Sequence, residues 1–123
     1  MLGGLFKKFK SASPLALWNV SFDGSDIVTS DGRGHERKMA IRDLTRVVVA
    51  TDDSGPWGAD VVFLLYSSEP DPTCLFPMEA NGIDTFMAWL SIQPGYQDRE
   101  LVRAMGSTKV AQFEVLIVGE NDI

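Results

Sequence analysis

The sequence has one cysteine, Cys74, and one histidine, His35, among its 123 residues. A single cysteine cannot form an internal disulfide, and with one histidine it supplies too few ligands for a structural zinc site. We therefore expect a reducing compartment, no metal and no other cofactor. Serine–histidine or cysteine–histidine catalysis would have to use His35. Because this residue stands in a turn rich in glycine and charge, we interpret it as solvated, and Cys74 as a buried, unreactive thiol.

Long apolar runs are also missing. No stretch approaches the roughly 20 consecutive apolar residues of a membrane-spanning helix. The first 13 residues contain three lysines, but they lack the apolar run of about 7–15 residues that a secretory signal needs. The expected location is therefore the cytoplasm.

Positive charge is scarce outside the N-terminus. The chain has 11 basic and 17 acidic residues, a formal net charge of −6, and three of its lysines lie within the first ten residues. A negative chain lacks the electrostatic field that attracts nucleic acids. Nucleic acid is therefore not an expected partner, whereas a basic protein surface would complement the acidic body.

Apolar residues are plentiful enough for one hydrophobic core. They make up 45% of the chain, and aromatic residues make up 10%. A chain of this length can enclose such a core without disulfides or metals. We divide it into residues 1–13, a basic amphipathic or flexible segment, and a single domain over residues 14–123.

The N-terminal segment suggests contact with a membrane surface. Leu2, Leu5, Phe6 and Phe9 share one side at helical spacing. Together with the lysines, these side chains suit the headgroup region of an anionic leaflet. The candidate membrane contacts are Leu5, Phe6, Lys7, Lys8, Phe9 and Lys10. Stable anchoring needs more apolar area, so a frayed tail or a helix docked on its own domain is the favoured interpretation.

Alternation with period two and β-branched runs predict a strand-rich first part. Trp18, Val20 and Phe22 alternate with other residues, which is typical of a strand with one buried face. Turns rich in glycine, aspartate and proline separate the apolar runs. Strands are expected over residues 17–22, 27–29, 38–41, 43–51, 61–66 and 73–76, and a last one over 112–118, with Phe113, Val115 and Ile117 on one face.

Helical periodicity replaces alternation after residue 81. The i, i+3, i+4, i+7 spacing is met by Ile83, Phe86, Met87 and Leu90. Asn81 is the expected N-cap of this helix. A second helix is expected to begin at a capping Asp98 and to end at Gly106, with Leu101, Val102 and Met105 facing inward.

The order of these elements predicts an α+β fold. We expect a mainly antiparallel, twisted sheet or partly open barrel of roughly six or seven strands. One or two helices between the penultimate and last strands would cover a face or an open end. The predicted core residues are Trp18, Val20, Phe22, Val47, Val49, Phe63, Leu65, Phe86, Leu90 and Phe113.

The loop after the strand 43–51 is the candidate binding site. Asp52, Asp53 and Asp60 bracket Trp57 in the order D-D-S-G-P-W-G-A-D. This order does not match an EF-hand loop, so turn-capping aspartates are favoured over a cation site. Trp57 either folds back onto the sheet, which we favour, or is exposed as a contact residue.

Two patterns resemble small uncharacterised bacterial proteins. They are T-D-x-x-G-P-W-x-x-D from Thr51 to Asp60, within a wider likeness from Ile41 to Leu65, and P-G-Y with A-M-G-S-T between Pro94 and Thr108. This resemblance implies no activity. The Ile-x-x-Leu-x-x-Val step from Ile41 is also similar, less specifically, to bacterial pleckstrin-homology-like domains, which would imply a barrel. Such domains end in a helix, whereas a strand is expected at the end of this chain.

No catalytic group is accompanied by the partners it would need. The leading hypothesis is a non-catalytic binding or regulatory module that meets a protein partner or forms a homo-oligomer, for example through a sheet edge. One version is a toxin-neutralising immunity protein, whose acidic face would pair with a basic enzyme cleft. One alternative is a small ligand-binding protein or enzyme that uses the Asp52, Asp53, Trp57 and Asp60 loop. The other is peripheral membrane attachment.

Overall fold

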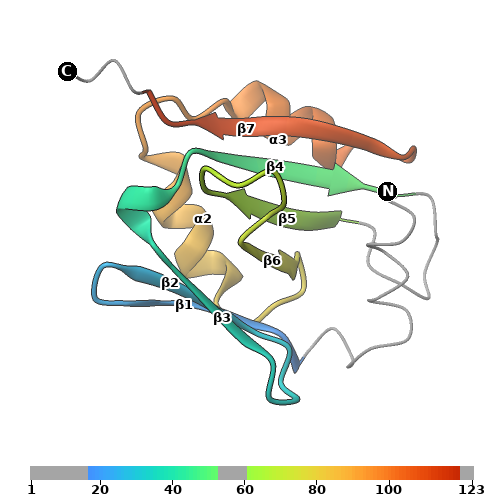
Figure 1. Ribbon diagram of the computed structural model, residues 1–123. Helices are drawn as coiled ribbons and strands as arrows, with labels where there is room; N and C mark the ends of the chain where they lie inside the picture. The colour runs from blue at the N-terminus through green and yellow to red at the C-terminus, as the bar shows by residue number, and fades with distance from the viewer. Residues whose placement is uncertain (1–16, 53–60, 120–123) are drawn as a thin grey trace.

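The computed structural model describes residues 17–52 and 61–119, which form seven strands and two α-helices (Figure 1). The strands are β1 (Asn19–Asp23), β2 (Asp26–Ser30), β3 (Glu36–Ala40), β4 (Arg46–Thr51), β5 (Val61–Tyr66), β6 (Cys74–Pro77) and β7 (Ala111–Ile117). The α-helices are α2 (Ile83–Ser91) and α3 (Asp98–Met105), and a 3-10 turn, η2 (Ile41–Asp43), joins β3 to β4.

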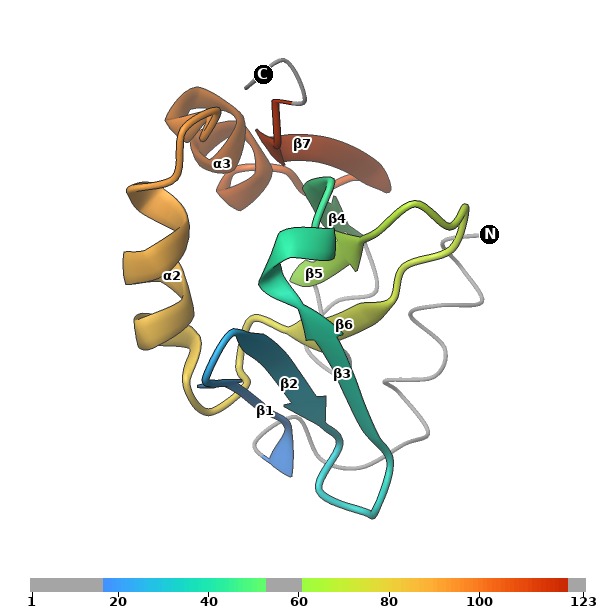
Figure 2. The ribbon, with the colours of Figure 1, turned by 60° about the vertical axis from the view of Figure 1, so that its left-hand side comes forward.

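The strands fall into two antiparallel sheets. β1, β2 and β3 form a meander, and the second sheet has the order β6-β5-β4-β7. The predicted α+β class with twisted antiparallel sheets is confirmed, and so is the position of the helices between the last two strands. The described strands do not close into a barrel (Figure 2), so the barrel implied by the pleckstrin-homology-like resemblance does not form.

One core lies between both sheets and the helices. Phe86 and Leu90 from α2 and Ala104 from α3 are fully buried in it. All ten predicted core residues belong to this cluster. Seven of them are buried, whereas Trp18, Phe22 and Phe113 are half-buried against it. Alternating and helical apolar patterns therefore identified the interior correctly.

The start of α2 differs from the prediction. The helix begins after Gly82, which has φ 91°, and Asn81 is not its cap. Instead, the backbone N–H of Asn81 donates to the Trp18 carbonyl at 2.8 Å, and its carbonyl accepts from the Val20 N–H at 2.9 Å. Because Asn81 is paired with β1, a left-handed glycine is needed to turn the chain into the helix.

The predicted cap and inward face of α3 are also partly wrong. Asp98 is its first helical residue, and Gln97 takes the cap position without a side-chain hydrogen bond. Ala104 is buried, whereas Val102 is 63% and Met105 39% exposed. The buried stripe runs through Leu101 and Ala104, and Val102 points about 100° away from Leu101 because a helix has 3.6 residues per turn.

A β-bulge in β7 breaks the predicted alternation of this strand. Val48 pairs with Glu114 and Val47 with Leu116, so Val115 is the extra residue between them. Val115 and Leu116 are both buried in consequence, and Ile117 is 51% exposed. Phe113, Val115 and Ile117 therefore do not share one face.

Candidate functional site

The structure describes only the first residue of the predicted binding loop. Asp52 follows β4 and is half-buried, whereas Asp53, Trp57 and Asp60 lie outside the described residues. The candidate membrane contacts Leu5 to Lys10 also lie outside them. Next to Asp52, the buried Thr51 hydroxyl donates to the Lys109 carbonyl at 2.6 Å. This bond ties the end of β4 to the chain entering β7, so it has a structural role.

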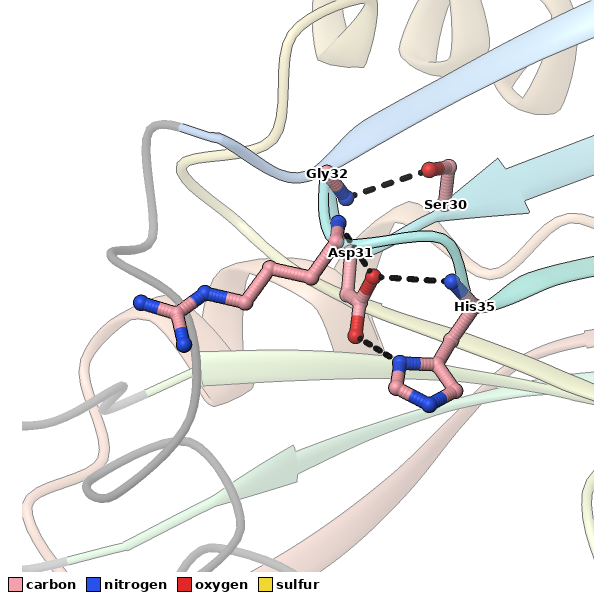
Figure 3. A network of polar contacts seen from close by, with 5 residues as sticks. Ser30, Asp31, Gly32 and His35 are labelled. Atoms are coloured by element: carbon pink, nitrogen blue, oxygen red, sulfur yellow. Dashed lines mark hydrogen bonds and ion pairs between the residues drawn. The ribbon is translucent and has the colours of Figure 1, made fainter.

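The lone histidine lies in the turn between β2 and β3 (Figure 3). Its side chain is 84% exposed, as expected for a solvated loop residue, but its Nδ1 lies 2.8 Å from Oδ2 of Asp31. The other carboxylate oxygen of Asp31 accepts from the backbone N–H groups of Arg33 at 2.7 Å and His35 at 3.2 Å. The carboxylate therefore organises the turn, and sequence spacing alone did not predict that it would.

These hydrogen bonds change the acidity of Asp31. The backbone N–H of Arg33 contributes most to lowering the pKa of this carboxyl, and His35 lowers it further through its imidazole and its backbone N–H; partial burial opposes them. Each of these donors stabilises the ionised carboxylate. The turn is consequently best formed when Asp31 carries its negative charge.

An Asp31→Asn variant is expected to lose part of the pH dependence of stability. Because the folded pKa of Asp31 lies below the unfolded one, the stabilisation is complete above the unfolded pKa of about 4 and is lost as pH falls through the folded pKa. The urea midpoint of the wild type should therefore fall more between pH 6 and pH 3 than that of the variant. Parallel curves would contradict this role, and Asp71→Asn, at an exposed carboxyl, is the charge-matched control.

Cys74 lies at the start of β6 and is fully buried, as predicted. Burial raises the pKa of its thiol, and hydrogen bonding to Thr29 only partly opposes this effect. A protonated thiol without solvent access is a poor nucleophile. We therefore assign Cys74 to the core.

An apolar pocket of about 420 Å³ lies between the end of α2, η2 and the end of β7. This volume falls in the range of small-molecule and side-chain pockets. Its lining residues are Ile41, Leu44, Trp89, Gln93, Pro94, Gly95, Leu116, Ile117, Val118 and Gly119. They carry apolar side chains, one carboxamide and backbone groups.

Long-range backbone contacts hold the walls of this pocket together. Gly95, with φ 93°, is so close to β7 that a Cβ atom there would overlap the Ile117 carbonyl oxygen. The N–H of Gln97 donates to the Val115 carbonyl at 2.8 Å, and the N–H of Val118 donates to the Thr45 carbonyl at 2.9 Å. The connection between α2 and α3 is thereby fixed against β7.

Trp89 supplies the aromatic wall of the pocket. Its ring lies 5.3 Å from that of Phe22 and 5.7 Å from that of Phe86, measured between centroids. Gln93 donates from its carboxamide to the Trp89 carbonyl at 2.8 Å and closes the last turn of α2. The wall is therefore continuous with the core.

Sequence reasoning did not find this pocket. It placed Trp89 in or near the core and used Pro94 and Gly95 only to end a helix. The available signal was the run of four consecutive apolar residues at 115–118, within the last expected strand. Outside β4, its backbone partners are Thr45, Tyr96 and Gln97, which are distant from it in the sequence.

The described residues were also compared with what a metal site and a membrane-spanning helix require. Within residues 17–52 and 61–119, no group of three or more histidine, cysteine, aspartate or glutamate side chains is placed to hold a metal ion. Neither α2 nor α3 has the length and apolar character to cross a bilayer.

The chain matches no protein-family model, no curated protein and no solved structure.

Proposed function

We propose that this chain is a non-catalytic, cytoplasmic binding module that receives an apolar side chain of a protein partner in the pocket beside Trp89. The composition of the pocket is the observation that supports this proposal. None of its described lining residues has a side chain that titrates or acts as a nucleophile. Such a lining offers apolar area and shape, which suit recognition, whereas acid–base or nucleophilic chemistry needs titratable groups.

The surroundings of the pocket favour a macromolecule over a small ligand. Ile117 and Val118 line it and are nevertheless 51% and 40% exposed. Ile92, directly before the lining residue Gln93, is 77% exposed. A small ligand inside the pocket would leave these side chains in water, whereas a protein partner would cover them as well. An aromatic or aliphatic anchor in the pocket would act as the centre of such an interface.

The charge of the chain indicates the character of the partner. With a formal net charge of −6, this protein attracts a basic surface and accelerates its association. A toxin-neutralising immunity protein is one function with these requirements. Regulation of another basic cytoplasmic protein is equally consistent with them.

The alternative functions rest on other parts of the chain. A ligand site or enzyme using Asp52, Asp53, Trp57 and Asp60 stays a prediction, as does peripheral membrane attachment through residues 5–10. Asp52 is the only residue of these two sets that the structure describes. Relatedness to small bacterial proteins also stays a prediction.

An Ile117→Asp variant tests the proposal. It places a charge at the rim of the pocket, and we expect binding of the natural partner to weaken by about tenfold or more. Partner capture from the native host would be measured by quantitative mass spectrometry, followed by titration calorimetry with the purified partner.

The control is Val110→Asp, which makes the same kind of change at a position 53% exposed at the other end of β7. This variant should retain the partner. Equal loss in both variants, or no loss in either, would contradict the assignment of the pocket. Co-purification of a metabolite without any stoichiometric protein would favour the ligand-binding alternative.

A further inference from the structure

The four-stranded sheet has a second apolar face, directed away from α2 and α3. Alternation along β4 and β5 places Val47, Val49, Phe63 and Leu65 in the main core and directs the residues between them to the opposite side. We call the buried residues on that side the second-face cluster; they are Val48, Ala50, Val62, Leu64 and Tyr66. The first four are at most 1% exposed, and Tyr66 is 7% exposed.

Within the described ranges, few apolar side chains from outside the cluster pack against it. The partly buried apolar side chains packed against the cluster within residues 17–52 and 61–119 are those of Trp18 and Leu75. Leu75 extends from β6 of the same sheet, so it borders the cluster without covering it. Toward β7 the face becomes polar, with the half-exposed ion pair of Arg46 and Glu114 at 3.3 Å. The Arg46 guanidinium also lies over the Tyr66 ring, with its carbon 3.9 Å from the ring centroid. An apolar segment long enough to span β4 and β5 would complete the cover of this face.

We propose that the N-terminal segment, residues 1–16, covers the second-face cluster of its own chain. Trp18 packs against both the main core and this cluster, so the segment joins the domain at the edge of the second face. Leu2, Leu5, Phe6 and Phe9 would face the sheet. Lys7 and Lys8 would then face the solvent on the other side of an amphipathic helix.

The dimensions of the segment match those of the face. A helix is about 10–12 Å in diameter, which spans the roughly 10 Å across β4, β5 and β6. Ten helical residues extend about 15 Å, compared with about 20 Å for the six-residue strands β4 and β5. Six further residues remain to connect such a helix to Leu17. The segment is thus long enough to cover the cluster without help from a second molecule.

This inference is independent of the proposed pocket, which lies on the other side of the sheet at the ends of α2 and β7. It also reassigns the apolar side chains that suggested membrane contact. If they pack on the domain, they are not available to a bilayer, and the lysines contribute to solubility. The segment becomes part of the fold.

A single reporter cysteine measures this cover directly. Ala50 is fully buried in the cluster and has a small side chain, so Ala50→Cys in a Cys74→Ala background places one thiol on the second face. In the full chain, this thiol should react with a disulfide reagent at least about tenfold more slowly than after Leu5→Ser and Phe9→Ser are added. Lys7→Ser with Lys8→Ser is the matched control and should leave the rate unchanged.

Far-UV circular dichroism and cooperative urea unfolding would first establish that each variant is folded. If the Leu5 and Phe9 double variant fails to fold, the folded Ala50→Cys protein is treated with a protease that removes the N-terminal segment. Comparing the thiol reaction rate before and after this cleavage then tests the same cover. Unchanged protection in the folded double variant would overturn the proposal and assign the cover to residues 53–60. Protection that weakens on dilution, together with a dimeric mass, would overturn it in favour of a second copy. Fast labelling of the Ala50→Cys thiol in the chain that keeps its natural N-terminal segment would also overturn the proposal.

Discussion

Replacing Phe86 by alanine should lower the free energy of unfolding by roughly 3–5 kcal/mol, the largest loss that we expect from a single truncation. Phe86 is fully buried on α2. Its ring centroid lies 5.0 Å from that of Phe76 and 5.8 Å from that of Phe63, both in edge-to-face geometry. It therefore joins α2 to β5 and β6, and alanine would leave a cavity between the helix and the sheet.

Urea unfolding monitored by circular dichroism measures this loss. Ile92→Ala is a suitable control, because Ile92 ends the same helix and is 77% exposed. Its substitution should change the free energy of unfolding by no more than about 0.5 kcal/mol. A loss below about 2 kcal/mol for Phe86→Ala would mean that the helix does not pack on the sheet in this way.

Gly82→Ala should destabilise the fold by about 3 kcal/mol. Gly82 has φ 91°, a conformation that costs a residue with a Cβ roughly 1–2 kcal/mol. The added Cβ would also overlap the carbonyl oxygen of Val20. β1 and the start of α2 would have to separate. This would weaken the hydrogen bonds of Asn81 to Trp18 and Val20, each contributing about 1 kcal/mol.

The Gly24→Ala variant separates the cost of the positive φ from the cost of the steric overlap. Gly24 also has positive φ, at 64°, but nothing lies within 4 Å of its added Cβ. This variant should lose only the conformational part, about 1 kcal/mol. Equal losses at the two positions in denaturant titrations would show that the contact between β1 and the chain before α2 contributes little.

The core and the class of the fold were accessible from the sequence because their signals are local. In β4, the run Val47, Val48, Val49 reads as a strand with both faces covered, and both faces are indeed buried. The spacing of Phe86 and Leu90 identified the buried side of α2 for the same reason. A repeat of 2 or 3.6 residues reports which side of an element is apolar.

The errors occurred where a distant segment changes a local preference. Asn81 is a good capping residue, but its backbone pairs with β1, which lies some 60 residues earlier in the chain. The bulge at Val115 depends on the register with Val47 and Val48 of β4. Neither partner can be recognised from the residues around position 81 or 115.

The candidate site shows the same division. Its apolar composition was present in the sequence, as was the shortage of histidine and cysteine that argues against several kinds of catalysis. The pocket beside Trp89 exists only because Gly95 and Gln97 come into contact with β7 and Thr45 bonds to Val118.

By itself, the sequence determined an acidic α+β chain with one main core and correctly identified its inner residues, because burial follows from side-chain polarity and periodicity. The tertiary structure decided the division into two sheets, the entry into α2, the phase of β7 and the position of the pocket. These features depend on which distant backbone groups pair, and hydrogen-bond pairing between remote segments leaves little trace in the order of the residues.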